Sequence, residues 1–230
     1  MRLRNVPHAT EKLMVSPCFI EKPEELKGRW HTYFNNNNPL FLEIGSGKGR
    51  FITTLARENP DKNYIAMEKY PSVLLKLIGK IPEGGFSNLA VISVDAENLE
   101  SFFEQDEVQG LYLNFSDPWP KKKHAKRRLT APGFLSLYEK VLKPKAVLEF
   151  KTDNPCLFQY SLETLAQSAL SIEDSSFDLY ESHLLVGNVA TEYEEKFHLQ
   201  GKPIFKLIAR LDEKKAVTAA DNVQEVNPLE

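Results

Sequence analysis

The 230-residue sequence has few cysteines and no long hydrophobic run, and each shortage excludes a class of protein. Its two cysteines, Cys18 and Cys156, lie far apart and form no CxxC pair, which argues against a zinc site and against a disulfide framework. We therefore expect two reduced thiols and no metal. No stretch approaches the roughly 18 apolar residues of a membrane span, so we expect a cytoplasmic protein.

The sequence also lacks an excess of positive charge. Its net charge is -3, so an attraction to nucleic acid must come from a local cluster of basic residues. Hydrophobic residues make up 42% and charged residues 27%, the balance of a globular protein that buries a sizeable core. This length and composition fit one α/β domain with extensions.

Apolar strands alternate with amphipathic helices from Pro39 onward, the pattern of βαβ units in a parallel sheet. The strands are apolar along most of their length, which indicates that helices cover both faces of the sheet. We predict strands over residues 40–44, 63–67, 89–94, 111–115 and 146–150, another near 177–180 and a last one over 203–211.

The regions on either side of this pattern have a different character. Residues 1–38 include a short helical pattern over 23–30, and we expect this N-terminal extension to cap the main domain of residues 39–211. Residues 212–230 are polar and unpatterned, and we expect a disordered tail.

A glycine-rich turn follows the first predicted strand of the main domain. Glu43 is followed by Gly45, Gly47 and Gly49, and a helical pattern begins directly afterwards. Such a turn brings free backbone amides to the carboxyl end of a strand, where a polar ligand can bind. The G-x-G-x-G spacing differs from the G-x-G-x-x-G spacing of the dinucleotide fingerprint. A turn without a ligand remains the alternative.

Acidic residues follow the next two predicted strands in the same phase. Glu68 comes after residues 63–67 and Asp95 after residues 89–94, so both belong at the sheet edge that carries the glycines. A carboxylate there can accept both ribose hydroxyls, and another can reach an adenine amino group. A single acidic residue at the end of a strand is more often a helix N-cap. Two such residues beside the glycines favour an adenosine pocket.

The most informative segment follows the fourth of these strands. It begins Asp117-Pro118-Trp119 and continues into residues 121–128, six of which are Lys or Arg. Basic side chains neutralise phosphates, and Trp119 offers a flat surface to a base, so the segment indicates RNA binding. A solvated basic loop is the simpler alternative.

The acidic residue before G-x-G-x-G resembles the first motif of the class I S-adenosylmethionine methyltransferases. The segment from Asp117 through Arg128 resembles the signature of the tRNA (guanine-N7)-methyltransferases, which methylate the guanine at position 46 in the variable loop. Lys151-Thr152-Asp153 and Thr191-Glu192-Tyr193-Glu194 resemble the same family, so the likeness covers about residues 40 to 210. It implies a Rossmann-like fold, with a mostly parallel seven-stranded sheet and an antiparallel last strand.

The resemblance also implies residue roles. It implies that Asp117 is catalytic. The residues expected to bind S-adenosyl-L-methionine are Glu43, Gly45, Gly47, Gly49, Glu68, Asp95 and Asp117. The substrate contacts would be Lys121, Asp153, Thr191, Glu192, Tyr193 and Glu194, and the RNA contacts Lys123, His124, Lys126, Arg127 and Arg128. Taken without the resemblance, Asp153 could equally be a helix cap and Tyr193 a partly buried aromatic.

Guanine N7 carries a lone pair and no proton, so its methylation needs alignment and electrostatics but no general base. The expected partner is tRNA, bound by a monomer or a homodimer. Three alternatives stay open: a methyltransferase acting on an amine of another nucleic acid or of a protein, a nicotinamide-dependent oxidoreductase, and a non-catalytic RNA-binding module.

Overall fold

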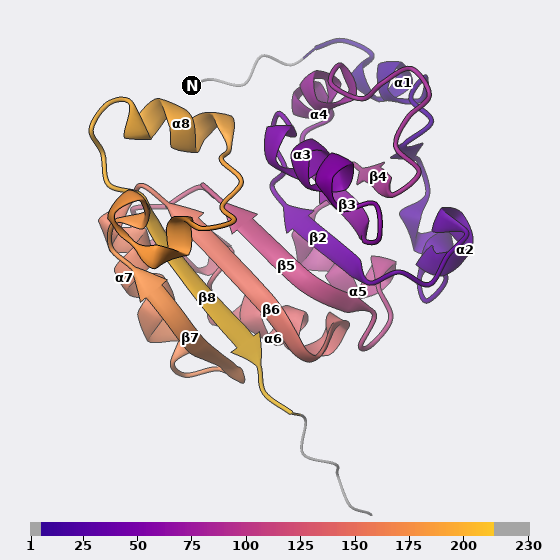
Figure 1. The fold of residues 1–230 in the computed structure, drawn as a ribbon. Coiled ribbons are helices and arrows are strands. Elements are labelled where there is room, and N and C mark those ends of the chain that lie inside the picture. Colours follow the sequence, from indigo (N-terminus) through magenta and orange to yellow (C-terminus); the bar gives the residue numbers. More distant parts are fainter. Residues whose placement is uncertain (1–5, 214–230) are drawn as a thin grey trace, which may run out of the picture.

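The computed structural model describes residues 6–213, which form an eight-stranded sheet in the order β1-β4-β3-β2-β5-β6-β8-β7 (Figure 1). Every neighbouring pair is parallel except the two that β8 makes with β6 and β7. The strands are β1 (Phe19–Ile20), β2 (Leu40–Ile44), β3 (Asn63–Met67), β4 (Leu89–Ile92), β5 (Val108–Asn114), β6 (Leu142–Thr152), β7 (Leu170–Ser176) and β8 (Phe205–Leu211). The predicted mostly parallel sheet with an antiparallel last strand is confirmed.

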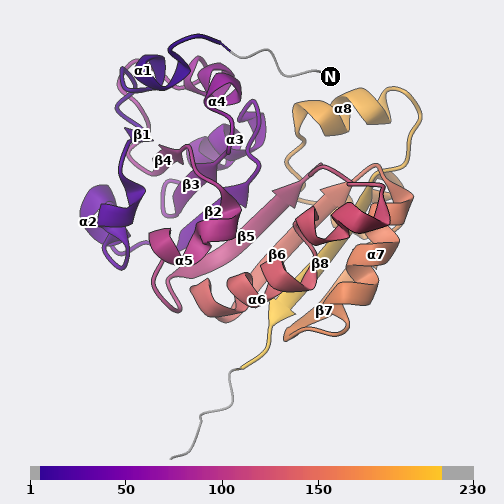
Figure 2. The ribbon, with the colours of Figure 1, turned by 180° about the vertical axis from the view of Figure 1, so that it is seen from behind.

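Helices cover both faces of this sheet. The α-helices are α1 (Ala9–Leu13), α2 (Trp30–Phe34), α3 (Arg50–Glu58), α4 (Pro71–Ile78), α5 (Leu99–Phe102), α6 (Pro132–Val141), α7 (Pro155–Leu165) and α8 (Glu192–His198). The 3-10 helices are η1 (Pro23–Leu26), η2 (Ala96–Asn98), η3 (Lys122–Arg127), η4 (Leu179–Glu181) and η5 (His183–Leu185). Figure 2 shows α5, α6 and α7 together on one face.

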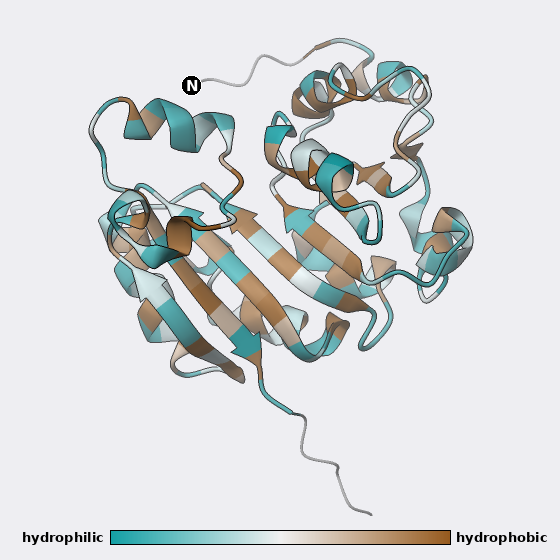
Figure 3. Ribbon diagram, viewed as in Figure 1, coloured by the Kyte–Doolittle hydropathy of each residue, from teal (hydrophilic) through white to brown (hydrophobic). Residues whose placement is uncertain are grey.

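Alternating side chains divide the core between the two faces. In β3, Ile65 packs into the larger cluster with residues of α5, α6 and α7, whereas Tyr64 packs with residues of α1, α3 and α4. Successive side chains of a strand point to opposite faces, so a strand covered on both sides must be apolar throughout. Figure 3 shows the central strands as largely hydrophobic and α8 as mostly hydrophilic.

The N-terminal segment adds the eighth strand. The two residues of β1 pair with Val91 and Ile92 of β4, and α1 packs on α4. Trp30 is buried, and its indole Nε1 donates to the carbonyl oxygen of Phe102 at 3.0 Å. Two residues are too short to give a periodicity, which is why the sequence predicted seven strands.

One predicted strand is wrong. Residues 177–180 do not form a strand, because Asp178 caps η4 by accepting from the backbone N of Tyr180 at 3.2 Å. The strand lies earlier, at β7, which has the polar sequence Leu-Ser-Ile-Glu-Asp-Ser-Ser. Polar residues fit there because β7 is at the edge of the sheet and every second side chain is exposed. The last strand begins at Phe205 instead of Pro203. The predicted tail falls, from residue 214 onward, outside the described residues.

Candidate functional site

The glycine-rich turn lies at the carboxyl end of β2. The backbone N atoms of Gly45 and Ser46 donate to the carbonyl oxygen of Met67, at 2.8 and 3.0 Å. Gly45, Gly47 and Gly49 all have φ between +56° and +80°, a region that favours glycine. A Cβ on Gly49 would lie 2.2 Å from Cγ of Leu77, so packing alone requires that glycine.

The other two glycines border open space. A Cβ on Gly45 would meet no heavy atom within 4 Å, and one on Gly47 would meet only a backbone oxygen of the same turn, at 3.8 Å. The absence of side chains at these positions therefore leaves room beside the backbone of the turn. Such room suits a ligand that approaches the backbone closely.

Glu43 lies beneath this turn and is 2% exposed. Its Oε1 accepts from Nδ2 of Asn114 at 2.9 Å, whereas its buried Oε2 has no hydrogen-bond partner within the described residues. Burial raises the pKa of Glu43 to about 8, with a small contribution from the charges of Glu192 and Glu68, against the lowering effect of the hydrogen bond from Asn114 and the charge of Lys151. A buried carboxylate oxygen without a partner, on the strand that leads into the glycine turn, suits a hydrogen bond from the cationic amino group of a ligand.

Glu68 and Asp95 lie at the same sheet edge, as predicted, because β3 and β4 are parallel neighbours. Glu68 accepts from the backbone N atoms of Gly47 at 3.2 Å and Tyr70 at 3.1 Å, which ties the glycine turn to the end of β3. Burial raises the pKa of Glu68, and the negative charge of Asp117, in the turn after the parallel neighbour β5 of β2, adds to that rise.

Asp95 has a second role in the described structure. Its Oδ1 accepts from the backbone N of Glu97 at 3.1 Å and thereby caps η2, and its Oδ2 forms an ion pair with Lys69. The helix-cap interpretation therefore applies to this residue, whose side chain is still 30% exposed.

Asp117 is exposed in a turn that follows β5 and lies between two residues with positive φ. Phe115 has φ of 51° and Trp119 of 40°, which is unusual for aromatic residues. The basic residues continue through Lys121 into η3, and the exposed ones are Lys121, Lys122, Lys123, Lys126 and Arg127. Arg127 lies over the ring of Trp119, 5.0 Å from its centroid, and His124 meets the edge of that ring at 5.8 Å.

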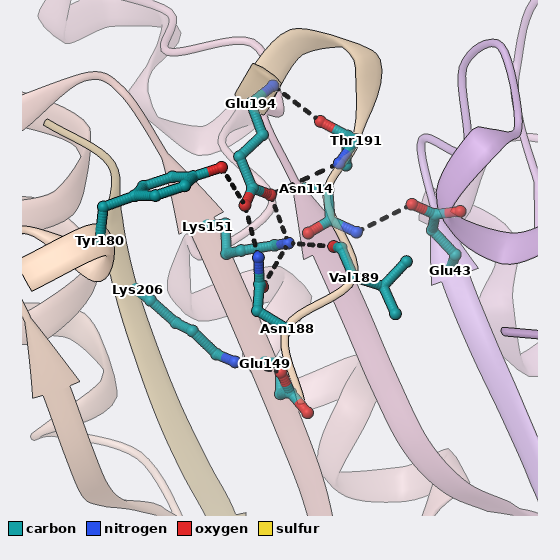
Figure 4. A network of polar contacts seen from close by, with 10 residues as sticks. All are labelled: Glu43, Asn114, Glu149, Lys151, Tyr180, Asn188, Val189, Thr191, Glu194 and Lys206. Atoms are coloured by element: carbon teal, nitrogen blue, oxygen red, sulfur yellow. Dashed lines mark hydrogen bonds and ion pairs between the residues drawn. The ribbon is translucent and has the colours of Figure 1, made fainter. Parts of the chain in front are cut away.

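A buried network holds the segment before α8 (Figure 4). Lys151 is 2% exposed, and its Nζ donates to Oε2 of Glu194 at 2.6 Å, to Oδ1 of Asn188 at 3.0 Å and to the carbonyl oxygen of Val189 at 2.8 Å. Burial lowers the pKa of Lys151, while Glu194 opposes that change. Thr191 and Glu194 form a capping box at the start of α8. These two residues are buried and thus shape the site from within.

Glu192 and Tyr193, the other two residues of the motif from Thr191 to Glu194, face outward from α8. Glu192 forms an ion pair with Lys80, and Lys48 of the glycine turn lies over the ring of Tyr193, 5.5 Å from its centroid. Lys80 also donates to the carbonyl oxygen of Lys48 at 2.8 Å. Charged contacts thus place Glu192 and Tyr193 beside the glycine turn.

Asp153 lies near this group but has a different partner. Its Oδ2 pairs with Nζ of Lys202 at 3.3 Å. The cap of α7 is Asn154 instead of Asp153, because its Oδ1 accepts from the backbone N of Leu157 at 2.8 Å. Sequence reasoning proposed no role for Asn114 or Asn188. Asn114 ends a strand at the same edge as Glu68, a signal that was available, whereas Asn188 lies in a loop without a pattern.

Two further observations concern metal sites and membrane-spanning helices. Across residues 6–213, no group of three or more His, Cys, Asp or Glu residues is arranged to hold a metal ion. No helix in that range is long and apolar enough to cross a membrane.

Comparisons with known proteins give a consistent result. A family model described as "Putative methyltransferase" matches residues 37–207. The chain is 48% identical to a tRNA (guanine-N(7)-)-methyltransferase of Lachnoclostridium phytofermentans, over 91% of this chain and 98% of the relative. It is 50% identical to one of Geobacillus sp., over 90% of this chain and 94% of the relative.

Among solved structures, the 16S rRNA methyltransferase KamB has a TM-score of 0.63 at 16% identity, covering 80% of this chain and 93% of that one. At this identity the likeness concerns the fold alone, and it confirms the predicted class I methyltransferase architecture.

Proposed function

The chain belongs to the family of the tRNA (guanine-N(7)-)-methyltransferases, and we therefore propose that it transfers a methyl group from S-adenosyl-L-methionine to N7 of a guanine in tRNA. The observation that carries this proposal is the 48% identity to such an enzyme over 91% of the chain. The target within tRNA is the guanine at position 46, in the variable loop. The enzyme acts in the cytoplasm as a monomer or a homodimer, which sedimentation distinguishes.

The cofactor lies over the glycine turn in this proposal. S-adenosyl-L-methionine supplies, when bound, a methyl group on a positively charged sulfur. The partnerless Oε2 of Glu43 and the open space at Gly45 and Gly47 fit its amino-acid end, and the carboxylates of Glu68 and Asp95 face the adenosine. Gly49 supports the site by allowing Leu77 to pack.

Asp117 is the catalytic residue of the proposal. Guanine N7 offers a lone pair and carries no proton, so Asp117 need not act as a base. Its carboxylate orients the guanine and stabilises the positive charge that develops on the purine ring. The parallel pairing of β2 with β5 supports this role, because it brings the turn after β5, which carries Asp117, to the same sheet edge as the glycine turn.

Two groups of residues bind the RNA. Lys121, Asp153, Glu192 and Tyr193 surround the target nucleotide, while Thr191 and Glu194 fix the helix that carries two of them. Lys123, His124, Lys126 and Arg127 contact phosphates without reading the sequence, since phosphate contacts position and base contacts specify. The exposure of Lys123, Lys126 and Arg127 supports this part of the proposal.

The first experiment is transfer of labelled methyl from S-adenosyl-L-methionine to unmodified tRNA, followed by nucleoside analysis. We expect 7-methylguanosine from the wild-type chain and a kcat about 100-fold lower for Asp117→Ala, with tRNA binding retained. A different methylated nucleoside, or transfer to DNA or protein but not tRNA, would overturn the proposal. An Asp117→Ala variant with unchanged kcat would remove that residue from catalysis.

The phosphate contacts have their own test. The variant Lys123→Ala/Lys126→Ala should weaken tRNA binding and reduce the slope of log affinity against log salt by about 1.4 to 1.8. Its affinity for S-adenosyl-L-methionine should not change. Lys140→Ala is the control, because Lys140 lies in the last turn of α6, next to the amino end of β6 and away from the carboxyl ends of the strands. Equal effects of both variants would show a nonspecific dependence on charge.

A further inference from the structure

Arg128 differs from the other basic residues of its segment. It is half-buried, whereas Lys121, Lys122, Lys123, Lys126 and Arg127 are exposed. Its Nε donates to the carbonyl oxygen of Pro118 at 3.0 Å, and its Nη2 donates to the carbonyl oxygen of Trp119 at 3.1 Å. Both acceptors belong to the turn that carries Asp117.

The flat face of the same guanidinium is also in contact. Its Cζ lies 4.3 Å from the centroid of the Tyr160 ring, on α7. Arg128 thus donates to the turn, while its guanidinium carbon lies over the Tyr160 ring of a helix that packs against the sheet. Arginine is suited to this double contact, because its rigid planar fork donates two hydrogen bonds while the same group lies over an aromatic ring, whereas the compact ammonium of lysine has no such preorganised fork.

The turn itself needs such support. Trp119 has φ of 40°, a conformation that side chains other than glycine rarely adopt, and its carbonyl oxygen is one of the two that Arg128 binds. A residue in this region persists only when its surroundings fix it. Asp117 is two residues away, so a change at Trp119 would displace its carboxylate.

We propose that Arg128 is a positioning residue that holds the turn carrying Asp117, in place of the phosphate contact suggested by its basic neighbours. This inference rests on the proposed function, since it concerns how Asp117 is held for methyl transfer. A positioning residue acts on the rate of the bound complex, whereas a phosphate contact acts on tRNA affinity and its salt dependence.

The test compares Arg128→Ala, Arg128→Lys and Lys126→Ala with the wild type. For each, kcat, tRNA affinity at several salt concentrations and thermal unfolding are measured. We expect both Arg128 variants to lose on the order of 10 to 100-fold in kcat, because small misplacements near a reacting group cost up to about 100-fold. Their tRNA affinity should stay within about twofold and their salt slope unchanged. Lys126→Ala should show the reverse: reduced affinity and slope with kcat kept.

Tyr160→Leu is a second variant that leaves the basic residues intact. We expect it to lower kcat in the same direction, and Arg128→Ala/Tyr160→Leu to lower kcat less than the product of the two single effects. If Arg128→Ala fails to fold, Arg128→Lys and Tyr160→Leu still give the comparison.

Weakened tRNA binding with a smaller salt slope in Arg128→Ala, restored by Arg128→Lys, would overturn the inference. An unchanged kcat in Arg128→Ala, Arg128→Lys and Tyr160→Leu would also overturn it. A wild-type chain that does not methylate tRNA would instead refute the proposed function, so the two failures are distinguishable.

Discussion

Replacement of Glu43 by Gln should stabilise the cofactor-free protein at pH 8 while weakening its affinity for S-adenosyl-L-methionine. The buried carboxyl has a pKa of about 8 in the folded chain against an ordinary value of 4.5. Below pH 4.5 the group is protonated in both states and has no effect on stability. As pH rises from 4.5 to about 8, the unfolded chain releases the proton that the folded chain keeps, so the free energy of unfolding falls.

The size of the effect follows from this window. Each pH unit inside it costs about 1.4 kcal/mol, so the loss at pH 7 is about 3 kcal/mol. Gln keeps an oxygen that can accept from Asn114, but it buries an NH₂ group where Oε2 has no partner, at a cost of about 1–3 kcal/mol. That cost does not depend on pH. The advantage of Glu43→Gln should therefore grow by about 3 kcal/mol between pH 5 and pH 8.

Urea unfolding of both proteins without cofactor, at pH 5, 6, 7 and 8, measures this difference. Titration calorimetry with S-adenosyl-L-methionine should show weaker binding by the variant at pH 8, where the wild-type carboxylate is half ionised. A difference in unfolding free energy that is constant across the pH range would mean that Glu43 ionises normally, and would refute the reasoning.

The glycine turn and the buried network allow two further predictions. Gly49→Ala should destabilise the fold by about 2 kcal/mol or more, because its Cβ would overlap Leu77, whereas Gly45→Ala should cost less in urea unfolding but weaken cofactor binding. Equal unfolding costs would contradict this. Lys151→Met should lower the unfolding free energy by about 3–5 kcal/mol, because it leaves Glu194 buried without its partner. Adding Glu194→Leu should recover part of that loss, and an additive double variant would show that the pair is not coupled.

Sequence reasoning succeeded where one residue type carries one physical requirement. Gly45, Gly47 and Gly49 signal a turn with positive φ, and the phase of Glu68 and Asp95 after apolar strands places them at one sheet edge. The same reasoning predicted the order of alternating strands and helices. These features depend on local pattern and on the geometry of parallel strands.

The remainder depends on contacts between distant parts of the chain. The sequence gives no sign that Glu194 pairs with Lys151, 43 residues away, or that Asn114 donates to Glu43, 71 residues away. In the sequence Arg128 is one of several basic residues, and only the structure shows its hydrogen bonds to Pro118 and Trp119 and its position over Tyr160. The polar edge strand β7 was missed because its pattern lacks the apolar run of a covered strand.

The place of β8 in the sheet has a consequence for synthesis of the protein on the ribosome. β7 pairs only with β8, which lies between it and β6, so β7 has no neighbour until the chain up to Leu211 has emerged. The acceptors of Lys151 likewise lie at residues 188–194. A nascent chain that already carries the glycine turn, Asp117 and the basic segment therefore still lacks β8 and the acceptors that hold the buried Nζ of Lys151.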